Sequence, residues 1–126
     1  MKTGRQLTGK RGEDAACEHL RSLGHTILER NWRHSHLEID IISADPAGIH
    51  FVEVKSRTAP VMEAPQYNVG PDKRRRLVRA AQAYAHRAEL PAGFGDEIFF
   101  DVVSVIFDGP ALKLEYFPQA WLPMFR

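Results

Sequence analysis

The sequence has very little cysteine, since Cys17 is the one thiol among 126 residues. A lone cysteine forms no internal disulfide and builds no thiolate metal site, so we expect a buried, reduced side chain. Long hydrophobic runs are also lacking, because no stretch approaches the roughly 18 to 20 apolar residues of a membrane-spanning helix. The segment Met1 to Ala15 has no apolar stretch of the secretory type. These absences argue against redox chemistry and predict a cytoplasmic protein that does not enter membranes.

Charge is nearly balanced over the whole chain, at +1, but it is unevenly distributed. Residues 1–87 carry fifteen Lys and Arg against ten Asp and Glu, whereas residues 88–126 carry two against six. The basic part would attract phosphate, although a solvated charged helix would give the same asymmetry. With 44% hydrophobic residues and no internal repeats, the chain can close one core, and we expect a single domain over residues 1–126.

The first predicted helix runs from Thr8 to Leu23, with Thr8 as its cap and Gly24 at the position that ends a helix. Projection at about 100° per residue places Glu13 on the apolar face of this helix. A carboxylate is therefore expected to point inward. The apolar face itself comprises Ala16, Cys17, Leu20 and Leu23.

Three short strands should follow, because branched and aromatic residues cluster in three segments separated by turn-forming residues. Hairpin-length connections predict that these strands form an antiparallel meander. The segment Ser56 to Gly70, with two prolines and no period, is predicted to be a mobile loop. The expected strands are Thr26 to Trp32, Leu37 to Ser43 and Ile49 to Lys55.

The second half should contain one helix and two strands. Proline is favoured in a first turn, which predicts a helix from Pro71 to about Glu89. Strands are expected over Ile98 to Phe107 and Leu112 to Phe117, joined by the turn signal Asp108-Gly109. A crossover through the second helix would make the third and fourth strands parallel. The prediction is an α/β fold in three layers, α/β/α, with a mixed five-stranded sheet in the chain order α-β-β-β-α-β-β.

Two carboxylates are expected to meet on neighbouring strands. The period of two puts Glu38 and Asp40 on one face of their strand, and Leu37, Ile39 and Ile41 on the other. The same rule places Glu53 and Lys55 together on the next strand. In the meander, Asp40 and Glu53 would then lie close to each other, which is costly unless a cation or hydrogen bonds compensate their charge.

Mg²⁺ or Mn²⁺ would compensate that charge, since hard cations prefer oxygen ligands. The ligand candidates are Asp40, Glu53 and the carbonyl of Val54. Lys55 could orient a water or stabilise a transition state on a phosphodiester, and Glu13 could hold a water or a second ion. Two plainer readings remain open: Glu53 and Lys55 could be a same-face ion pair, and Glu13 could pair structurally with Arg11 or Lys55.

These residues resemble a known pattern, in which an Asp, a dozen residues and then Glu-x-Lys follow a helix that bears a glutamate. The pattern is that of the PD-(D/E)xK nuclease superfamily, and the segments Gly9–Glu13, Ile27–Arg33, Glu38–Ile42 and Phe51–Arg57 are similar to the YraN family of bacterial proteins. The resemblance implies a restriction-endonuclease-like fold close to that of archaeal Holliday-junction resolvases. It also implies that Glu13, Asp40, Glu53 and Lys55 form a metal-dependent catalytic site. The chain departs from the pattern at Leu37, where the family usually has glycine, and at Ile39, where the superfamily's name has proline.

Basic residues around this site are candidates for nucleic-acid contacts. Phosphate contacts carry little sequence information, so selection of branched or junction DNA by structure is favoured over base reading, with DNA expected more than RNA. A two-fold dimer would suit a substrate with two scissile strands. The arginines of the second helix could equally be a solvated face. The named candidates are Lys10, Arg11, Arg57, Lys73 and Arg76.

The remaining histidines and aromatic residues receive plainer assignments. His34, His36 and His50 lack the spacing of a zinc site, so turn or surface positions are expected, although His36 could approach the metal. Trp32, Trp121 and Phe125 are expected in packing rather than base stacking. Two functional hypotheses follow: a metal-dependent nuclease, or a nucleic-acid-binding or partner-binding module with the same fold and little turnover. A purely structural ion-pair cluster is the third.

Overall fold

A computed structural model describes residues 4–61, 70–87, 93, 95 and 97–122 of the chain. The elements follow one another in the expected order of helix, three strands, helix and two strands. Their bounds are α1 Gly4–Ser22, β1 Thr26–His34, β2 Leu37–Asp45, β3 Gly48–Thr58, α2 Pro71–Arg87, β4 Glu97–Asp108 and β5 Ala111–Trp121. Within these described residues, no helix is long and apolar enough to cross a membrane.

The five strands form one mixed sheet in the order β1-β2-β3-β4-β5. The pairs β1/β2, β2/β3 and β4/β5 are antiparallel, and β3 and β4 are parallel over the full length of β3. Antiparallel strands can be joined by tight turns, whereas parallel strands need a crossover connection. Here α2 is part of the crossover between the parallel strands β3 and β4. The predicted mixed five-stranded sheet is confirmed.

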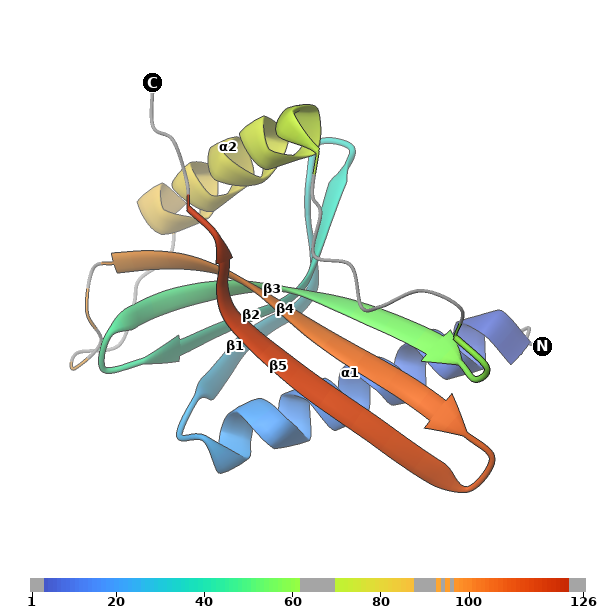
Figure 1. Ribbon diagram of the computed structural model, residues 1–126. Coiled ribbons are helices and arrows are strands. Elements are labelled where there is room, and N and C mark those ends of the chain that lie inside the picture. Colours follow the sequence, from blue (N-terminus) through green and yellow to red (C-terminus); the bar gives the residue numbers. More distant parts are fainter. Residues whose placement is uncertain (1–3, 62–69, 88–92, 94, 96, 123–126) are drawn as a thin grey trace.

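The two helices cover opposite faces of the sheet, which gives the expected three layers (Figure 1). One apolar cluster joins α1 to the sheet through residues such as Leu20, Val52 and Val103. A second cluster joins α2 to the other face through residues such as Phe51, Tyr84 and Phe100. Cys17, 1% exposed, lies in the α1 cluster, and burial raises the pKa of its thiol. The expectation of a buried thiol is confirmed.

The first helix ends as predicted but begins earlier. Gly24 adopts a φ of +94°, and the amides of Gly24 and His25 donate to the carbonyls of Arg21 and Leu20. This closes the last turn in the way that glycine allows. The prediction of Thr8 as the cap is wrong, since the helix already begins at Gly4. Leu23, expected on the buried face, lies beyond the helix end and is 52% exposed.

Several strands and turns differ in length from the prediction. β3 continues through Ser56 to Thr58, because these residues pair with β4. β5 continues through Pro118 to Trp121, which is compatible with its position at the edge of the sheet, where proline costs no ladder hydrogen bond. The two hairpin turns are shorter than expected, since β1 and β2 reach His34 and Asp45. The predicted mobile loop falls mostly on residues 62–69, outside the described residues.

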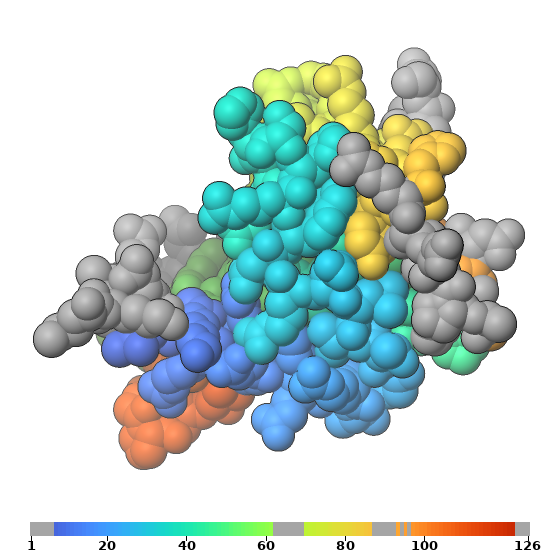
Figure 2. Space-filling model, turned by 180° about the vertical axis from the view of Figure 1, so that it is seen from behind, coloured from blue at the N-terminus to red at the C-terminus, as the bar shows by residue number. Residues whose placement is uncertain are grey.

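The β1–β2 hairpin bends out of the sheet towards α2 (Figure 1). The register of β1 shifts between Ile27 and Glu29, and Asn31 has a φ of 53° in the middle of the strand. Because of this bend, Ile39 packs in the α2 cluster and Ile41 in the α1 cluster. The expectation that they share one face is therefore wrong. Seen from behind, the hairpin, in cyan, occupies the surface between the two helices (Figure 2).

Candidate metal centre

Asp40 lies where β2 separates from β3. The pairing between these strands ends at Ile41 and Val52. Two residues further along β3, the backbone amide of Val54 donates to Asp40 Oδ2 at 2.8 Å. Burial raises the pKa of the Asp40 carboxyl to about 6, an effect that the Val54 hydrogen bond opposes. Three neighbouring carboxylates raise this pKa further: Glu13, Glu53 and Glu38.

Glu53 carries an acceptor without a donor. Its Oε1 accepts from Lys73 Nζ at 2.7 Å, whereas its Oε2 is buried and has no hydrogen-bond partner among the residues that the structure describes. Buried carboxylate oxygens are normally paired, because desolvation of an unpaired one is expensive. Glu53 Oε2 is therefore an atom of the kind that a cation would satisfy.

Asp40 and Glu53 line one pocket of about 100 Å³ between the sheet and α2. Organic ligands usually occupy pockets of roughly 300 to 1,000 Å³, so this volume suits an ion and a few waters better. The lining contains hard oxygen donors of the type that Mg²⁺ and Mn²⁺ prefer. The other polar lining residues are Glu38, Lys73 and Asp101. The donor set fits a hard divalent cation.

Glu13 approaches the same region from α1. The helix comes very close to β3 here, since a Cβ on Gly12 would lie 1.8 Å from Ser56 Oγ. Glu13 is not among the described residues that line the pocket of Asp40; it lines the adjoining groove with Ser56 and Arg57. Its carboxylate lies 3.6 Å from Arg30 Nη2.

Asn31 is a residue of the site that the sequence reasoning passed over. Its side-chain nitrogen donates to Glu13 Oε2 at 3.3 Å, and the opposite orientation of the amide gives 3.0 Å to Glu13 Oε1 and 2.9 Å to Glu38 Oε1. In that second orientation one neutral donor group bridges two carboxylates from α1 and β2. The signal available in the sequence was an asparagine, a residue that tolerates positive φ, interrupting an otherwise regular strand.

Lys55 and Val54 follow Glu53 on β3. Lys55 shares the parity of Glu53, is partly buried and stands opposite Ser104 of β4, but it is not among the described residues that line the Asp40 pocket. The Val54 side chain packs against the α1 cluster, and its backbone amide donates a hydrogen bond to Asp40. The structure thus brings Asp40 and Glu53 into one pocket, with Glu13 beside it.

The basic candidates occupy different surroundings. Lys10 is exposed on α1, and the guanidinium of Arg11 lies 4.8 Å from the centre of the Phe107 ring. Arg57 lines the groove that contains Glu13. Lys73 is engaged with Glu53. Arg76 is exposed and, with Arg79, lines a separate open pocket of about 330 Å³ that also contains the β1–β2 turn residues His34, Ser35, His36 and Leu37.

His50 is buried, at 5% exposure, so the expectation of a turn or surface position is wrong for this residue. It lies on β3 with the parity of Val52, which faces the α1 layer. This alternation was the signal that could have shown its burial. His36 is exposed as expected, Trp121 is buried on Phe100 with ring centres 4.1 Å apart, and Phe125 lies outside the described residues.

Comparison with known proteins identifies the family. The sequence profile of the uncharacterised protein family UPF0102 matches residues 12–105. The chain belongs to this family. Similar relatives include UPF0102 proteins of Nitratidesulfovibrio vulgaris, 40% identical with 96% of this chain and 88% of that one covered, and of Bacteroides fragilis, 36% identical with 93% of each covered. UPF0102 is the YraN family that the sequence motifs resemble, so that prediction is confirmed.

One solved structure gives a weaker likeness. It is a Holliday junction resolvase, Hjc, of the archaeal hyperthermophile Archaeoglobus fulgidus, with a TM-score of 0.47 and 16% identity, and the match covers 86% of this chain and 75% of that one.

Within the UPF0102 chain, the two departures from the expected motif have packing roles. Leu37 and Ile39 both contact the α2 cluster, so the bent hairpin is anchored by apolar side chains at these positions.

Proposed function

We propose that this UPF0102 protein is a divalent-metal-dependent nuclease that hydrolyses phosphodiester bonds in DNA. The observation that carries the proposal is the buried Glu53 Oε2 without a donor, in the same pocket as Asp40, whose pKa is raised by burial and by other carboxylates. Lys73 pairs with one oxygen of Glu53, and a divalent cation would compensate the remaining buried negative charge. The motif resemblance described from the sequence supports the same function.

Asp40 and Glu53 would hold the ion, with the carbonyl of Val54 as a further ligand and Mg²⁺ or Mn²⁺ as the cation. When bound, a divalent cation supplies Lewis-acid polarisation of a phosphodiester oxygen and neutralises charge that accumulates during attack. The hydrogen bond from the Val54 amide fixes the Asp40 carboxylate before an ion arrives. Glu13 would orient water at the edge of the pocket, and Lys55 would stabilise negative charge on the phosphate.

DNA phosphates would approach over two sets of basic side chains, one around the groove that contains Glu13 and one around the open pocket at the β1–β2 turn. Arg57 lies in the groove that contains Glu13, and Lys10 and Arg11 belong to the same helix as Glu13. Arg76 borders the open pocket at the β1–β2 turn. Backbone contacts of this kind position a duplex without reading its bases, so recognition of branched or junction DNA by shape is the favoured specificity. Because such a substrate has two strands to cut, the protein would act as a homodimer.

The test is a cleavage assay with the full chain. Labelled linear, flap and four-way-junction DNA are incubated with the protein in Mg²⁺, in Mn²⁺ or in EDTA. Metal-dependent cleavage is expected, and Asp40→Asn and Glu53→Gln should each reduce it by at least about 100-fold. Asp108→Asn, an exposed carboxylate at the β4–β5 turn, is the matched control and should cleave like the wild type.

Each variant is checked by circular dichroism for an unchanged fold. Cleavage that persists in both pocket variants would show a contaminating enzyme and exclude this site. Binding to junction DNA without cleavage in any metal would replace the nuclease with a nucleic-acid-binding module. RNA substrates of the same shapes, run in parallel, decide the class of nucleic acid.

A further inference from the structure

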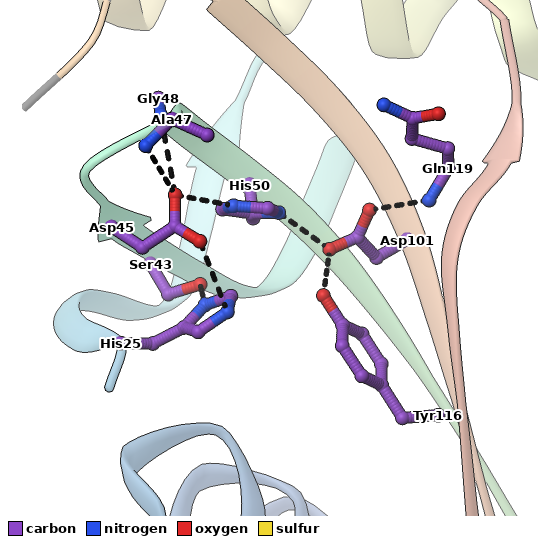
Figure 3. Close-up of polar contacts among 9 residues, drawn as sticks. All are labelled: His25, Ser43, Asp45, Ala47, Gly48, His50, Asp101, Tyr116 and Gln119. Atoms are coloured by element: carbon purple, nitrogen blue, oxygen red, sulfur yellow. Dashed lines mark hydrogen bonds and ion pairs between the residues drawn. The ribbon is translucent and has the colours of Figure 1, made fainter. Parts of the chain in front are cut away.

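We propose a second metal site, formed by His25, Asp45 and His50, that takes a single first-row transition-metal ion of the Zn²⁺ type and stabilises the fold. The proposal does not rest on the nuclease function, and none of the three ligands lines the pocket of Asp40 and Glu53, although Asp101, which holds His50, does. Its three donor atoms all lie within 4.8 Å of one another. The residues come from the α1–β1 connection, the end of β2 and the start of β3, and the Asp45 carboxylate directs one oxygen to each imidazole ring (Figure 3).

The distances are close to those that an ion would require. His50 Nε2 lies 3.0 Å from Asp45 Oδ1, and His25 Nε2 lies 3.6 Å from Asp45 Oδ2. Around tetrahedral Zn²⁺, with bonds of about 2.0 to 2.2 Å, ligand atoms are roughly 3.3 Å apart. The imidazole centres are 4.4 Å apart. The two distances to Asp45 therefore lie on either side of the spacing that the ion requires.

An unpartnered buried atom supplies the second observation. The His50 side chain is only 7% exposed, and within the described part of the chain its Nε2 makes no hydrogen bond. The nearby Asp45 Oδ1 is within ion-pair distance but does not meet the geometry of a hydrogen bond, and the same oxygen already accepts from the amides of Ala47 and Gly48. A buried polar atom normally has a partner, so this imidazole nitrogen and the carboxylate that it faces are suited to share a cation.

Each imidazole has a partner at its outer nitrogen, Nδ1. His50 Nδ1 lies 2.7 Å from Asp101 Oδ2, and His25 Nδ1 lies 2.9 Å from Ser43 Oγ. Asp101 is fixed in turn by the hydroxyl of Tyr116 and the amide of Gln119 (Figure 3). A carboxylate that holds the far nitrogen of a histidine fixes its tautomer and raises its basicity as a ligand. Both Nε2 atoms are thereby directed at Asp45.

The donor chemistry selects the class of ion. Two imidazole nitrogens and one carboxylate suit Zn²⁺ and its neighbours, whereas Mg²⁺ prefers oxygen ligands alone. The site joins the end of α1 to the β2–β3 hairpin and, through Asp101, to β4. Binding would therefore stabilise the folded chain, because the three donors come together only after folding.

The experiment uses the full chain, freed of metal by EDTA and exchanged into metal-free buffer. Co²⁺ is titrated as a spectroscopic probe and Zn²⁺ as its competitor. The titration is run in a large excess of Mg²⁺, which competes at the oxygen ligands of Asp40 and Glu53 and not at imidazole nitrogens. Under these conditions we expect one Co²⁺ per chain with a visible d–d spectrum of nitrogen and oxygen coordination, displacement by Zn²⁺, and a higher melting temperature with Zn²⁺. On Zn²⁺ binding, the imidazole ¹⁵N signals of two of the six histidines should shift.

Two variants and two controls locate the ion. Asp45→Asn keeps an acceptor for the turn amides yet should weaken Co²⁺ binding at least 10-fold, and His25→Gln should do the same. His36→Gln and the double variant Asp40→Asn, Glu53→Gln should bind like the wild type. The proposal is overturned if the wild type binds no Co²⁺, if no histidine signal shifts, or if only the double variant Asp40→Asn, Glu53→Gln loses the ion.

Discussion

At the scale of single residues, the raised pKa of Asp40 makes the stability of the protein depend on pH. The folded-state pKa of about 6 exceeds the ordinary value of 3.8, chiefly because of burial. Between these two pH values the Asp40 carboxyl is protonated in the folded protein and ionised in the unfolded chain. The contribution of Asp40 to the free energy of unfolding is fully present below pH 3.8. It falls as pH rises through that window and stays lost above pH 6.

The Asp40→Asn substitution should remove this dependence. Without divalent ions at pH 7.5 the variant should be more stable than the wild type by about 1 to 2 kcal/mol, allowing for partial solvent exposure, because no charge is buried. At pH 3.5 the two should be equal. Urea unfolding at both pH values measures the difference, with Asp108→Asn as a neutral control. A variant that is less stable than the wild type at pH 7.5 would contradict the buried-charge account.

The sequence predicted part of the candidate site for a definite reason. Asp40 and Glu53 follow from local rules, the strand period and the hairpin that joins β2 to β3. His25, Asp45 and His50 do not, because their proximity depends on how the end of α1 meets the β2–β3 hairpin, which no spacing in the chain encodes. Asn31 was missed because its role depends on a backbone φ.

At the scale of elements, the contact between α1 and β3 depends on Gly12. A Cβ there would lie 1.8 Å from Ser56 Oγ and 2.9 Å from Ser56 Cβ, whereas a Cβ on Gly9 of the same helix would meet nothing within 4 Å. The two glycines should therefore respond oppositely to alanine, although helix propensity favours the change at both.

Gly9→Ala should stabilise the protein by about 0.5 to 1 kcal/mol, since alanine favours the helix. Gly12→Ala should destabilise it by about 1 to 3 kcal/mol, because the helix must move away from β3. Urea unfolding measures both. In a Ser56→Ala background the cost of Gly12→Ala should shrink, since the closest atom has been removed. Equal effects at Gly9 and Gly12 would show that the helix does not pack on β3 in this way.

Element order and type could be predicted from the sequence, whereas several ends could not. Periodicity and turn residues are local and located all seven elements. The extra length of β3 comes from pairing with β4, a partner about fifty positions away in the chain. β5 passes Pro118 because it lies at the sheet edge, and edge position is a property of the finished topology.

At the scale of the whole molecule, the excess of positive charge in residues 1–87 predicts a salt-dependent affinity for DNA. Each phosphate neutralised by a basic side chain adds about 0.9 to the slope of log K against log salt. Arg76→Ala and Arg57→Ala should each weaken junction binding and reduce this slope by about 1. Fluorescence anisotropy over a salt series in Ca²⁺ or EDTA measures both.

Lys113→Ala serves as the charge-matched control, because this lysine is exposed on β5 in the acidic part of the chain. It should leave the slope unchanged. A slope that falls equally in all three variants would reveal only a net-charge effect, and no localised DNA surface.

The contact between Lys73 and Glu53 gives the acidic pocket a counter-ion that belongs to the protein itself. An incoming divalent ion that takes Glu53 would release this ammonium, which is already 41% exposed and stands on the first turn of α2. Once released, it becomes a partner for a phosphate. Metal and polyanion would then be reciprocal effectors, each tightening the binding of the other by the same factor, through one side chain that changes its partner.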